Sequence, residues 1–496
     1  MREQFWRRDA GACAALFVLA ATVRVLFLLG TVDRDLPFSI FYYGDSRAYR
    51  ELALAILRGE VFDHGIPFHP PGFAYALAMV IGACGERPTL VRAVLAIASA
   101  SSVPLAYLLG LRIWGRAVAW TGALLTTFSF GLLVTSVSAN TETIYIPILA
   151  AQALLLVLLG DALAERRRAA GRVLLVASGI VLGIGALTRA EHLAMAVLLP
   201  TALWVGWRSL GARRVFTAFG VLVGVAAVVL APWTIHSYRS ISRFNVASPD
   251  LPEPLPTLVL VSGYGPLNFA LANNPRADGT FRPDSIVATM GKGRLDFRDP
   301  RQMEIYRHGY RLGREYLTAN PREAIGLVVR KLDLAADAFA LGFGLSNWPG
   351  GLRGTRRSVD LFTPEREHWK PVSVALAALG LYLSRSRWRR ASIVWLGSLD
   401  AAFVAMAFFG YARFFVAIAP LACCLQAVAL VTGASCLPSP RVRRVVAGIG
   451  AALAAALLLE LALAAWVPRN FRASGIVDSA TGKILQDAAV EIAPVR

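Results

Sequence analysis

The sequence predicts an all-α protein, a polytopic transmembrane helical bundle with about 11 spans, interfacial helices and two large outer loops. Hydrophobic residues make up 56% of the 496 residues and charged residues only 17%, a balance typical of membrane proteins. The apolar residues fall into runs long enough to cross a bilayer, and arginine clusters separate these runs. A lipid bilayer is therefore the expected solvent.

The spans are predicted from runs of roughly 20 mainly apolar residues, with shorter runs tolerated inside a bundle. The range 11–30 follows a basic N-terminus and is longer than a signal-peptide core, so we interpret it as an uncleaved first helix. Ten further runs qualify, and 173–187 and 369–383 are the shortest of them. They are 90–111, 117–137, 141–159, 173–187, 192–207, 215–233, 369–383, 391–409, 414–431 and 445–466.

Arginine-rich junctions occur at every second loop, as the positive-inside rule requires of cytoplasmic loops. The formal charge of +19 is spread over these clusters and forms no continuous basic face, so nucleic acid is not an expected partner. We predict a multi-pass membrane protein with a cytoplasmic N-terminus. The clusters are at 7–8, 112–116, 166–168, 208–214, 385–390 and 441–444.

Two more apolar stretches, 70–84 and 324–342, would invert this topology if they crossed, so we expect both to lie in the outer interface. The resulting organisation has four parts. They are an N-terminal transmembrane module (1–233) with a first outer loop (31–89), an extracytoplasmic region (234–370), C-terminal transmembrane helices (371–466) and an extracytoplasmic tail (467–496).

The five cysteines show no CxxC spacing, and four of them lie in or beside apolar segments, so neither a disulfide framework nor a zinc site is predicted. Chemistry, if present, is expected in the outer loops.

Two segments of the first outer loop carry candidate residues. Asp45 stands immediately before an amphipathic helix, where an N-cap role is a sufficient structural explanation. His69 begins a His-Pro-Pro segment in which Pro71 suits the first turn of another helix. Taken alone, each residue is explained by local structure.

Other ionisable groups gather at the same outer level of the predicted bundle. Glu142 begins the fourth span, Arg189 occupies a short turn between two spans, and Arg413 follows Tyr411 at the start of another. Arg92 lies near this level as well. Charges at the membrane edge can be snorkelling anchors, but intramembrane charges more often indicate function.

The large outer region contains Asn274 in an Asn-Asn-Pro-Arg-Ala-Asp-Gly segment, which turn formation alone would explain.

In order, these features resemble the C-type glycosyltransferase superfamily, in its bacterial branch related to protein O-mannosyltransferases and the aminoarabinose transferase. The matching marks are Asp45, the segment 69–71, Glu142, the Leu-Thr-Arg at 187–189, the loop 273–279, and Arg413-Phe414 with Pro420. Many relatives have Asp-Glu where this chain has Asp45-Ser46, so a role for that second acid does not transfer.

The resemblance implies a sugar donor carried on a polyprenyl phosphate, transfer on the outer face of a bacterial inner membrane, and a glycan, lipid or protein acceptor. Asp45 is then the candidate general base, and Glu142 is a second catalytic residue that could orient a sugar or acceptor hydroxyl. Arginine binds phosphate oxygens well, so Arg189 and Arg413 are the candidate donor-binding residues. Arg92, His69, Tyr411 and Asn274 complete the predicted substrate-binding set.

Glu142 could instead share a divalent metal with Asp45, since hard cations prefer carboxylate oxygens. No second acid adjoins Asp45, so we predict no metal and no other cofactor. The competing functions are a polytopic transporter and a non-catalytic protein of the same fold that binds lipid-linked sugars.

Overall fold

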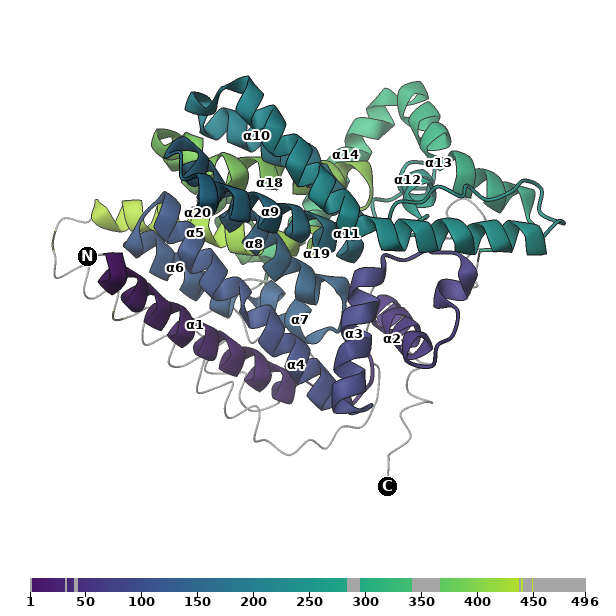
Figure 1. Ribbon diagram of the computed structural model, residues 1–496, viewed down its shortest axis with the longest axis horizontal. Coiled ribbons are helices and arrows are strands. Elements are labelled where there is room, and N and C mark those ends of the chain that lie inside the picture. Colours follow the sequence, from purple (N-terminus) through teal and green to yellow (C-terminus); the bar gives the residue numbers. More distant parts are fainter. Residues whose placement is uncertain are drawn as a thin grey trace.

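The computed structural model describes residues 2–31, 34–39, 43–282, 295–340 and 366–436, together with positions 439 and 448. Helices connected by short turns make up this part of the chain, and it contains no strand, which confirms the predicted all-α class. Figure 1 shows the helices packed side by side, with α12, α13 and α14 together at one end.

The N-terminal part forms most of the bundle. Its helices, in chain order, are α1 (Arg2–Gly30), α2 (Tyr43–Leu57), η2 (Phe62–Gly65), α3 (Pro71–Cys84), α4 (Pro88–Ala100), α5 (Ser102–Ile113), α6 (Arg116–Phe128), α7 (Phe130–Val137), α8 (Thr141–Ala164), α9 (Arg168–Thr188), η3 (Ala190–Ala194), α10 (Met195–Gly206), η4 (Arg208–Leu210) and α11 (Gly211–Ala247).

The second part adds short helices and further apolar ones. They are α12 (Gly265–Ala272), α13 (Pro300–Ala319), α14 (Pro321–Ala335), α15 (Asp337–Ala340), α17 (Arg366–Leu383), η8 (Ser384–Arg387), α18 (Trp388–Ala407), α19 (Ala412–Ala417) and α20 (Ala419–Ser435).

Within the described ranges, six helical stretches are long and apolar enough to cross a membrane, and α6 with α7 makes a seventh that is bent by 54°. Three shorter apolar helices accompany them: Pro71–Cys84, Ala190–Gly206 and Ala419–Ser435. The chain is thus a multi-pass membrane protein. The eleventh predicted span, 445–466, and the tail 467–496 lie outside the described residues, so the predicted total is not tested.

One of the six apolar helical stretches, Lys370–Ala407, is 38 residues long. Lys370 at its start bonds Asp333 of α14, and Lys331 of the same helix donates to the Met406 carbonyl near its end. A straight helix of that length would separate its ends by roughly 55 Å. The chain therefore reverses at η8, and α17 and α18 lie antiparallel as two separate helices.

Helix α11 packs closely on α9 and extends far along the first loop. Gly179 and Gly183 of α9 face α11 so closely that an added Cβ would lie 2.7 Å from Val225 and 2.6 Å from Val229, the close approach that small residues four apart permit. Helix α11 continues without a break beyond the predicted span 215–233, as far as Ala247. Its polar extension buries Ser237 and Ile241, and Ser240 donates to the Gly65 carbonyl at 2.8 Å.

Arginine-rich junctions within the described residues meet at one end of the bundle. Arg116 pairs with Asp9, and Arg390 pairs with Asp161. Arg387 donates to the carbonyl of Ile113 at 2.8 Å. These contacts join junctions that are far apart in the sequence, so these junctions lie together in the structure.

Candidate active site

The start of α8 is fixed by a capping box, in which the Asn140 side chain accepts the Thr141 N–H at 2.9 Å and the Thr143 hydroxyl accepts the Asn140 N–H. Ala139 just before it has φ of 49°, a left-handed conformation that is uncommon for alanine. This rigid turn places Glu142 in the first turn of α8, where the helix N-terminus favours a negative charge.

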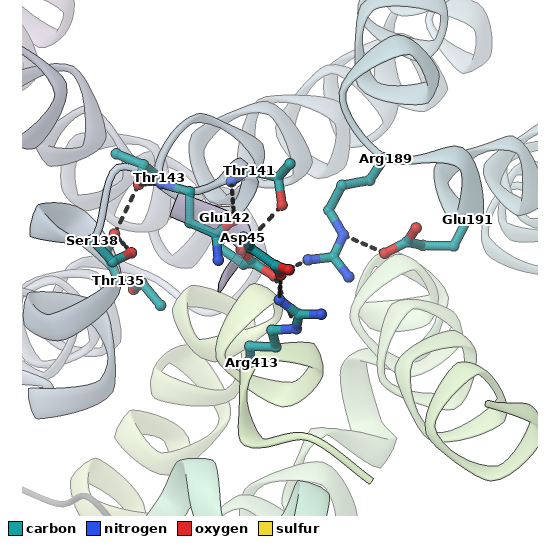
Figure 2. A network of polar contacts seen from close by, with 10 residues as sticks. Asp45, Thr135, Ser138, Thr141, Glu142, Thr143, Arg189, Glu191 and Arg413 are labelled. Carbon is teal, nitrogen blue, oxygen red and sulfur yellow. Dashed lines mark hydrogen bonds and ion pairs between the residues drawn. The ribbon is translucent and has the colours of Figure 1, made fainter. Parts of the chain in front are cut away.

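Glu142 is fully buried and belongs to a chain of ion pairs, drawn in Figure 2. Its Oε2 accepts from the Thr141 hydroxyl at 3.0 Å, and its Oε1 accepts from Nη1 of Arg189. Arg189 is the C-cap residue of α9, and its Nε donates to Glu191 in η3. One guanidinium therefore connects the beginning of α8 to the turn between α9 and α10.

Arg413 on α19 brings the first loop to the same place. Its Nη1 donates to Asp45 Oδ2, and its Nε lies 3.8 Å from Glu142 Oε1. That Nε is buried and has no hydrogen-bond partner among the described residues. Four segments distant in sequence thus contribute one alternating series of acids and guanidiniums, Asp45–Arg413–Glu142–Arg189, as Figure 2 shows.

Aromatic rings pack against both guanidiniums. The Arg189 guanidinium carbon is 5.4 Å from the Tyr145 ring centroid and 5.2 Å from that of Phe414. Arg413 lies 5.2 Å from Tyr411 and 5.8 Å from Phe414. Phe414 is shared by both cations, so cation–π contacts keep the guanidiniums in place while their N–H groups remain directed at the carboxylates.

Asp45 lies in the first turn of α2, and 46% of its side chain is exposed. Partial burial favours its neutral acid, but the charge and hydrogen bond of Arg413 outweigh this and lower the pKa of Asp45. The neighbouring Ser46 is fully buried, and its hydroxyl accepts the Ser39 N–H at 3.0 Å. The residue that replaces an acid of many relatives therefore fastens the loop rather than facing the site.

His69 is held by an acid that the sequence did not single out. Asp63 Oδ2 lies 2.9 Å from His69 Nδ1 and also accepts the backbone N–H groups of Phe68 and His69, at 2.9 and 2.8 Å. The Tyr49 and Tyr264 rings pack near the imidazole, with centroids 5.7 and 6.5 Å away. The only sequence signal for Asp63 was its place in a turn-forming Asp-His-Gly segment.

Three predicted residues have contacts that explain them structurally. Arg92 is buried and donates to the Val137 carbonyl at 2.7 Å, so it supports the turn before α8. Asn274 bonds the carbonyls of Ala270 and Leu271, at 3.1 and 2.8 Å, which makes it part of the turn after α12. The Tyr411 hydroxyl accepts the backbone N–H of Phe281 at 2.8 Å.

Lys331 is a second residue whose role the sequence did not reveal. It is fully buried on α14, and its Nζ donates to Asn273 Oδ1 at 2.9 Å and to the Met406 carbonyl at 3.1 Å. Burial lowers its pKa to about 7. The available signal was its spacing, because Leu327, Lys331 and Ala335 share one helix face and the two neighbours are apolar.

The segment before Arg413 is fastened to the same helix. Gly410 packs against the backbone of Lys331, and its N–H donates to the Gly279 carbonyl at 2.8 Å. An added Cβ at position 410 would lie 2.3 Å from the Lys331 carbonyl oxygen. The loop 273–279, α14 and the segment 406–411 therefore form a single support for Tyr411 and Arg413.

A divalent ion shared by Asp45 and Glu142 would have to displace the Arg413 guanidinium that now lies between them. The described residues contain no group of three or more His, Cys, Asp or Glu side chains arranged to hold a metal ion.

Comparisons with known proteins point in one direction. Residues 68–236 match the family model described as dolichyl-phosphate-mannose-protein mannosyltransferase. A search of curated proteins finds no match.

Solved structures with a similar fold include the Archaeoglobus fulgidus oligosaccharyltransferase in its apo form, with a TM-score of 0.52, 14% identity, and coverage of 92% of this chain and 57% of that one. The archaeal oligosaccharyltransferase AglB from Archaeoglobus fulgidus, in complex with an inhibitory peptide and a dolichol-phosphate, has a TM-score of 0.51 and 14% identity. That match covers 94% of this chain and 57% of AglB. ArnT from Cupriavidus metallidurans, bound to undecaprenyl phosphate, has a TM-score of 0.37 and 16% identity. That match covers 85% of this chain and 79% of ArnT.

The chain thus spans little more than half the length of the oligosaccharyltransferase, and at this identity the likeness shows a shared fold. The family model covers the segment that carries His69, Glu142 and Arg189. The matched segment and the shared fold both agree with the resemblance to the C-type glycosyltransferases drawn from the sequence.

Proposed function

We propose that the protein transfers a sugar from a polyprenyl-phosphate carrier to an acceptor hydroxyl or phosphate on the outer face of the inner membrane. The observation that carries this proposal is the ion-pair series Asp45–Arg413–Glu142–Arg189. Glu142 is fully buried and Asp45 is 46% exposed, so the series reaches from the interior to the surface. Glu142 lies at the start of α8, whereas Asp161, which pairs with Arg390 of an arginine-rich junction, lies near the other end of this helix. A preorganised, partly open group of charges suits the stabilisation of a charged transition state.

In this proposal Asp45 is the general base. Arg413 engages Oδ2, which leaves Oδ1 for the acceptor hydroxyl. The hydroxyl oxygen attacks the anomeric carbon, the bond from that carbon to the phosphate oxygen breaks, and the electron pair leaves with the lipid phosphate.

The two arginines stabilise the leaving phosphate. Both are already paired and packed against aromatic rings, so little reorganisation is needed as negative charge develops. Glu142 keeps the two guanidiniums about a common centre, and the buried Nε of Arg413 is the donor whose hydrogen bond is not satisfied by the described residues. Such an unsatisfied donor is a natural contact for a substrate oxygen.

The proposal is tested with purified protein in lipid vesicles that contain labelled polyprenyl-phosphate-mannose and a membrane extract as acceptor source. Wild-type protein should release polyprenyl phosphate and label an acceptor, while Asp45→Asn should do neither at a measurable rate. The matched control is Glu51→Gln, on the same helix and 64% exposed. Full activity in Asp45→Asn would remove the base assignment.

The same vesicles separate transfer from transport. A transporter would move the intact donor across the bilayer without breaking the sugar–phosphate bond, so free polyprenyl phosphate would not accumulate. Mass spectrometry of the lipid fraction distinguishes the two results, and a panel of other polyprenyl-phosphate sugars extends the test to the identity of the donor.

A further inference from the structure

Asp63 lies in a turn whose backbone is held in unusual conformations. Asp63 and His64 have φ of 49° and 56°, in the left-handed region, and Gly65 follows with 86°. Side-chain-bearing residues persist in this region when the surroundings impose it, often at functional sites. Here Ser240 of α11 donates to the Gly65 carbonyl, and Phe62 packs edge-on against Trp233, with ring centroids 5.1 Å apart.

This turn directs one carboxylate oxygen of Asp63 towards the His69 ring. Asp63 Oδ2 accepts two backbone N–H groups and faces Nδ1, so the proton of the neutral imidazole is placed on Nδ1. Nε2 is then left with its lone pair. The side-chain hydrogen bond of His69 to the described residues is made by Nδ1, and 30% of the side chain is exposed. The hydrogen bond of Nδ1 to Asp63 fixes the orientation of the ring, and Nε2 remains available to accept a proton.

Asp45 and Tyr49 are four residues apart on α2 and share one face of that helix, and the Tyr49 ring lies 5.7 Å from the imidazole, so Asp45 and His69 lie on the same side of α2. The charge of each also affects the pKa of the other. Burial alone would lower the pKa of His69, but its hydrogen bond to Asp63 and the charges of Asp63 and Asp45 outweigh this and raise it. Arg413 lowers the pKa of Asp45. The other titratable groups around the imidazole are Tyr49 of α2 and Tyr264. Of this group, His69 is the stronger proton acceptor near neutral pH.

We infer that His69 is the final proton acceptor of the reaction and that Asp63 is the positioning residue that fixes its tautomer. The inference rests on the proposed function. The acceptor O–H bond breaks as the new glycosidic bond forms, and the proton passes through Asp45 to the lone pair of His69 Nε2. Asp63 balances the resulting imidazolium, and Asp45 returns to its charged form. The imidazolium then loses its proton to water before the next turnover.

The first test is the pH dependence of sugar transfer. Because His69 must be neutral to accept a proton, kcat should fall as pH decreases through its pKa. His69→Gln should lower kcat about 100-fold and remove this acid limb. Asp63→Asn should move the limb to lower pH and reduce kcat about 10-fold. His64→Asn and Glu60→Gln, exposed neighbours in the same loop, are the controls and should leave the profile unchanged.

The second test does not depend on activity. Diethyl pyrocarbonate reacts with neutral imidazole, and mass spectrometry of the peptide that contains both histidines reports each site. Half-maximal modification of His69 should occur at a higher pH in wild type than in Asp63→Asn, and His64 in the same peptide is the reference. Asn at position 63 keeps an oxygen for the backbone N–H groups, and His69→Gln leaves them untouched, so one variant remains informative if the other fails to fold.

The outcomes separate the two proposals. If wild type transfers sugar but His69→Gln keeps the acid limb, the relay is refuted and the transferase stands. If activity falls with rising pH through the His69 pKa, the imidazolium is the active form and the relay is again refuted. If wild type transfers no sugar from any donor, the proposed function and the relay both fail, whatever the modification shows.

Discussion

The two ends of the bundle use the same residue type in different ways. At the arginine-rich end Arg116 and Arg390 are about half exposed, and each pairs with a single carboxylate. At the other end Arg189 is 8% exposed and Arg413 23%, and their carboxylate partner Glu142 is fully buried. A pair with a half-exposed arginine is weakened by solvent, whereas buried pairs that share one carboxylate fix a geometry. The difference indicates which arginines belong to a site.

Glu142→Ala should give the largest effect, because it leaves two buried guanidiniums without their common partner. Removing one member of a buried ion pair costs about 3–5 kcal/mol, so thermal unfolding in detergent should occur at a clearly lower temperature and transfer should be lost. Asp161→Asn, at the arginine-rich end, is the comparison and should retain transfer. Equal effects of the two changes would contradict the distinction between the ends.

Arg413→Ala should lower kcat/KM for the polyprenyl-phosphate donor by about 100-fold or more, because a preorganised donor to the leaving phosphate is lost. The matched change is Arg390→Ala, whose side chain is 52% exposed, and it should alter stability by less than about 1 kcal/mol and leave kinetics unchanged. Initial rates over a range of donor concentrations measure both. Unchanged donor kinetics in Arg413→Ala would exclude it from the site.

Gly410→Ala tests the support behind Arg413. The new Cβ would meet the Lys331 carbonyl, so we expect a loss of about 1–3 kcal/mol and reduced transfer. Gly433→Ala, near the C-terminal end of α20, is the control. Its added Cβ would have no atom within 4 Å, so the change should be neutral. Unfolding temperatures of the two variants in detergent make the comparison, and a neutral Gly410→Ala would show that the segment 406–411 is loosely held.

The last expected effect concerns Lys331 and the dependence of stability on pH. Its folded pKa of about 7 lies below the unfolded value near 10.4, so the unfolded chain binds the extra proton between these limits. The lysine therefore destabilises the fold below about pH 7, and this penalty disappears as pH rises towards 10. Wild type should gain more thermal stability than Lys331→Met between pH 7 and 10. Parallel curves for the two proteins would contradict the assignment.

Much of the fold could be predicted because lipid imposes long apolar runs, and the described helices follow those runs. The bend between α6 and α7 and the extension of α11 to Ala247 could not be predicted. The extension is a half-buried polar helix that packs on the first loop, and hydropathy marks only the segment inside the bilayer.

The site was partly predictable for a related reason. Asp45, Glu142, Arg189 and Arg413 shared one outer level, and the structure brings them together. Asp63 and Lys331 were missed because their partners are known only once the chain is folded. Asp63 bonds His69, and Lys331 bonds Asn273 and the Met406 carbonyl. A single sequence does not show which loops meet.

The central claim is that Asp45 and Arg413 act as one unit in sugar transfer. A double-mutant cycle of Asp45→Asn, Arg413→Gln and the combined variant, read as transfer from polyprenyl-phosphate-mannose in vesicles, tests it most directly. We expect each single change to remove most activity and the double variant to be no worse than the more damaging single one. Losses that simply multiply, or a single variant with wild-type activity, would contradict the claim.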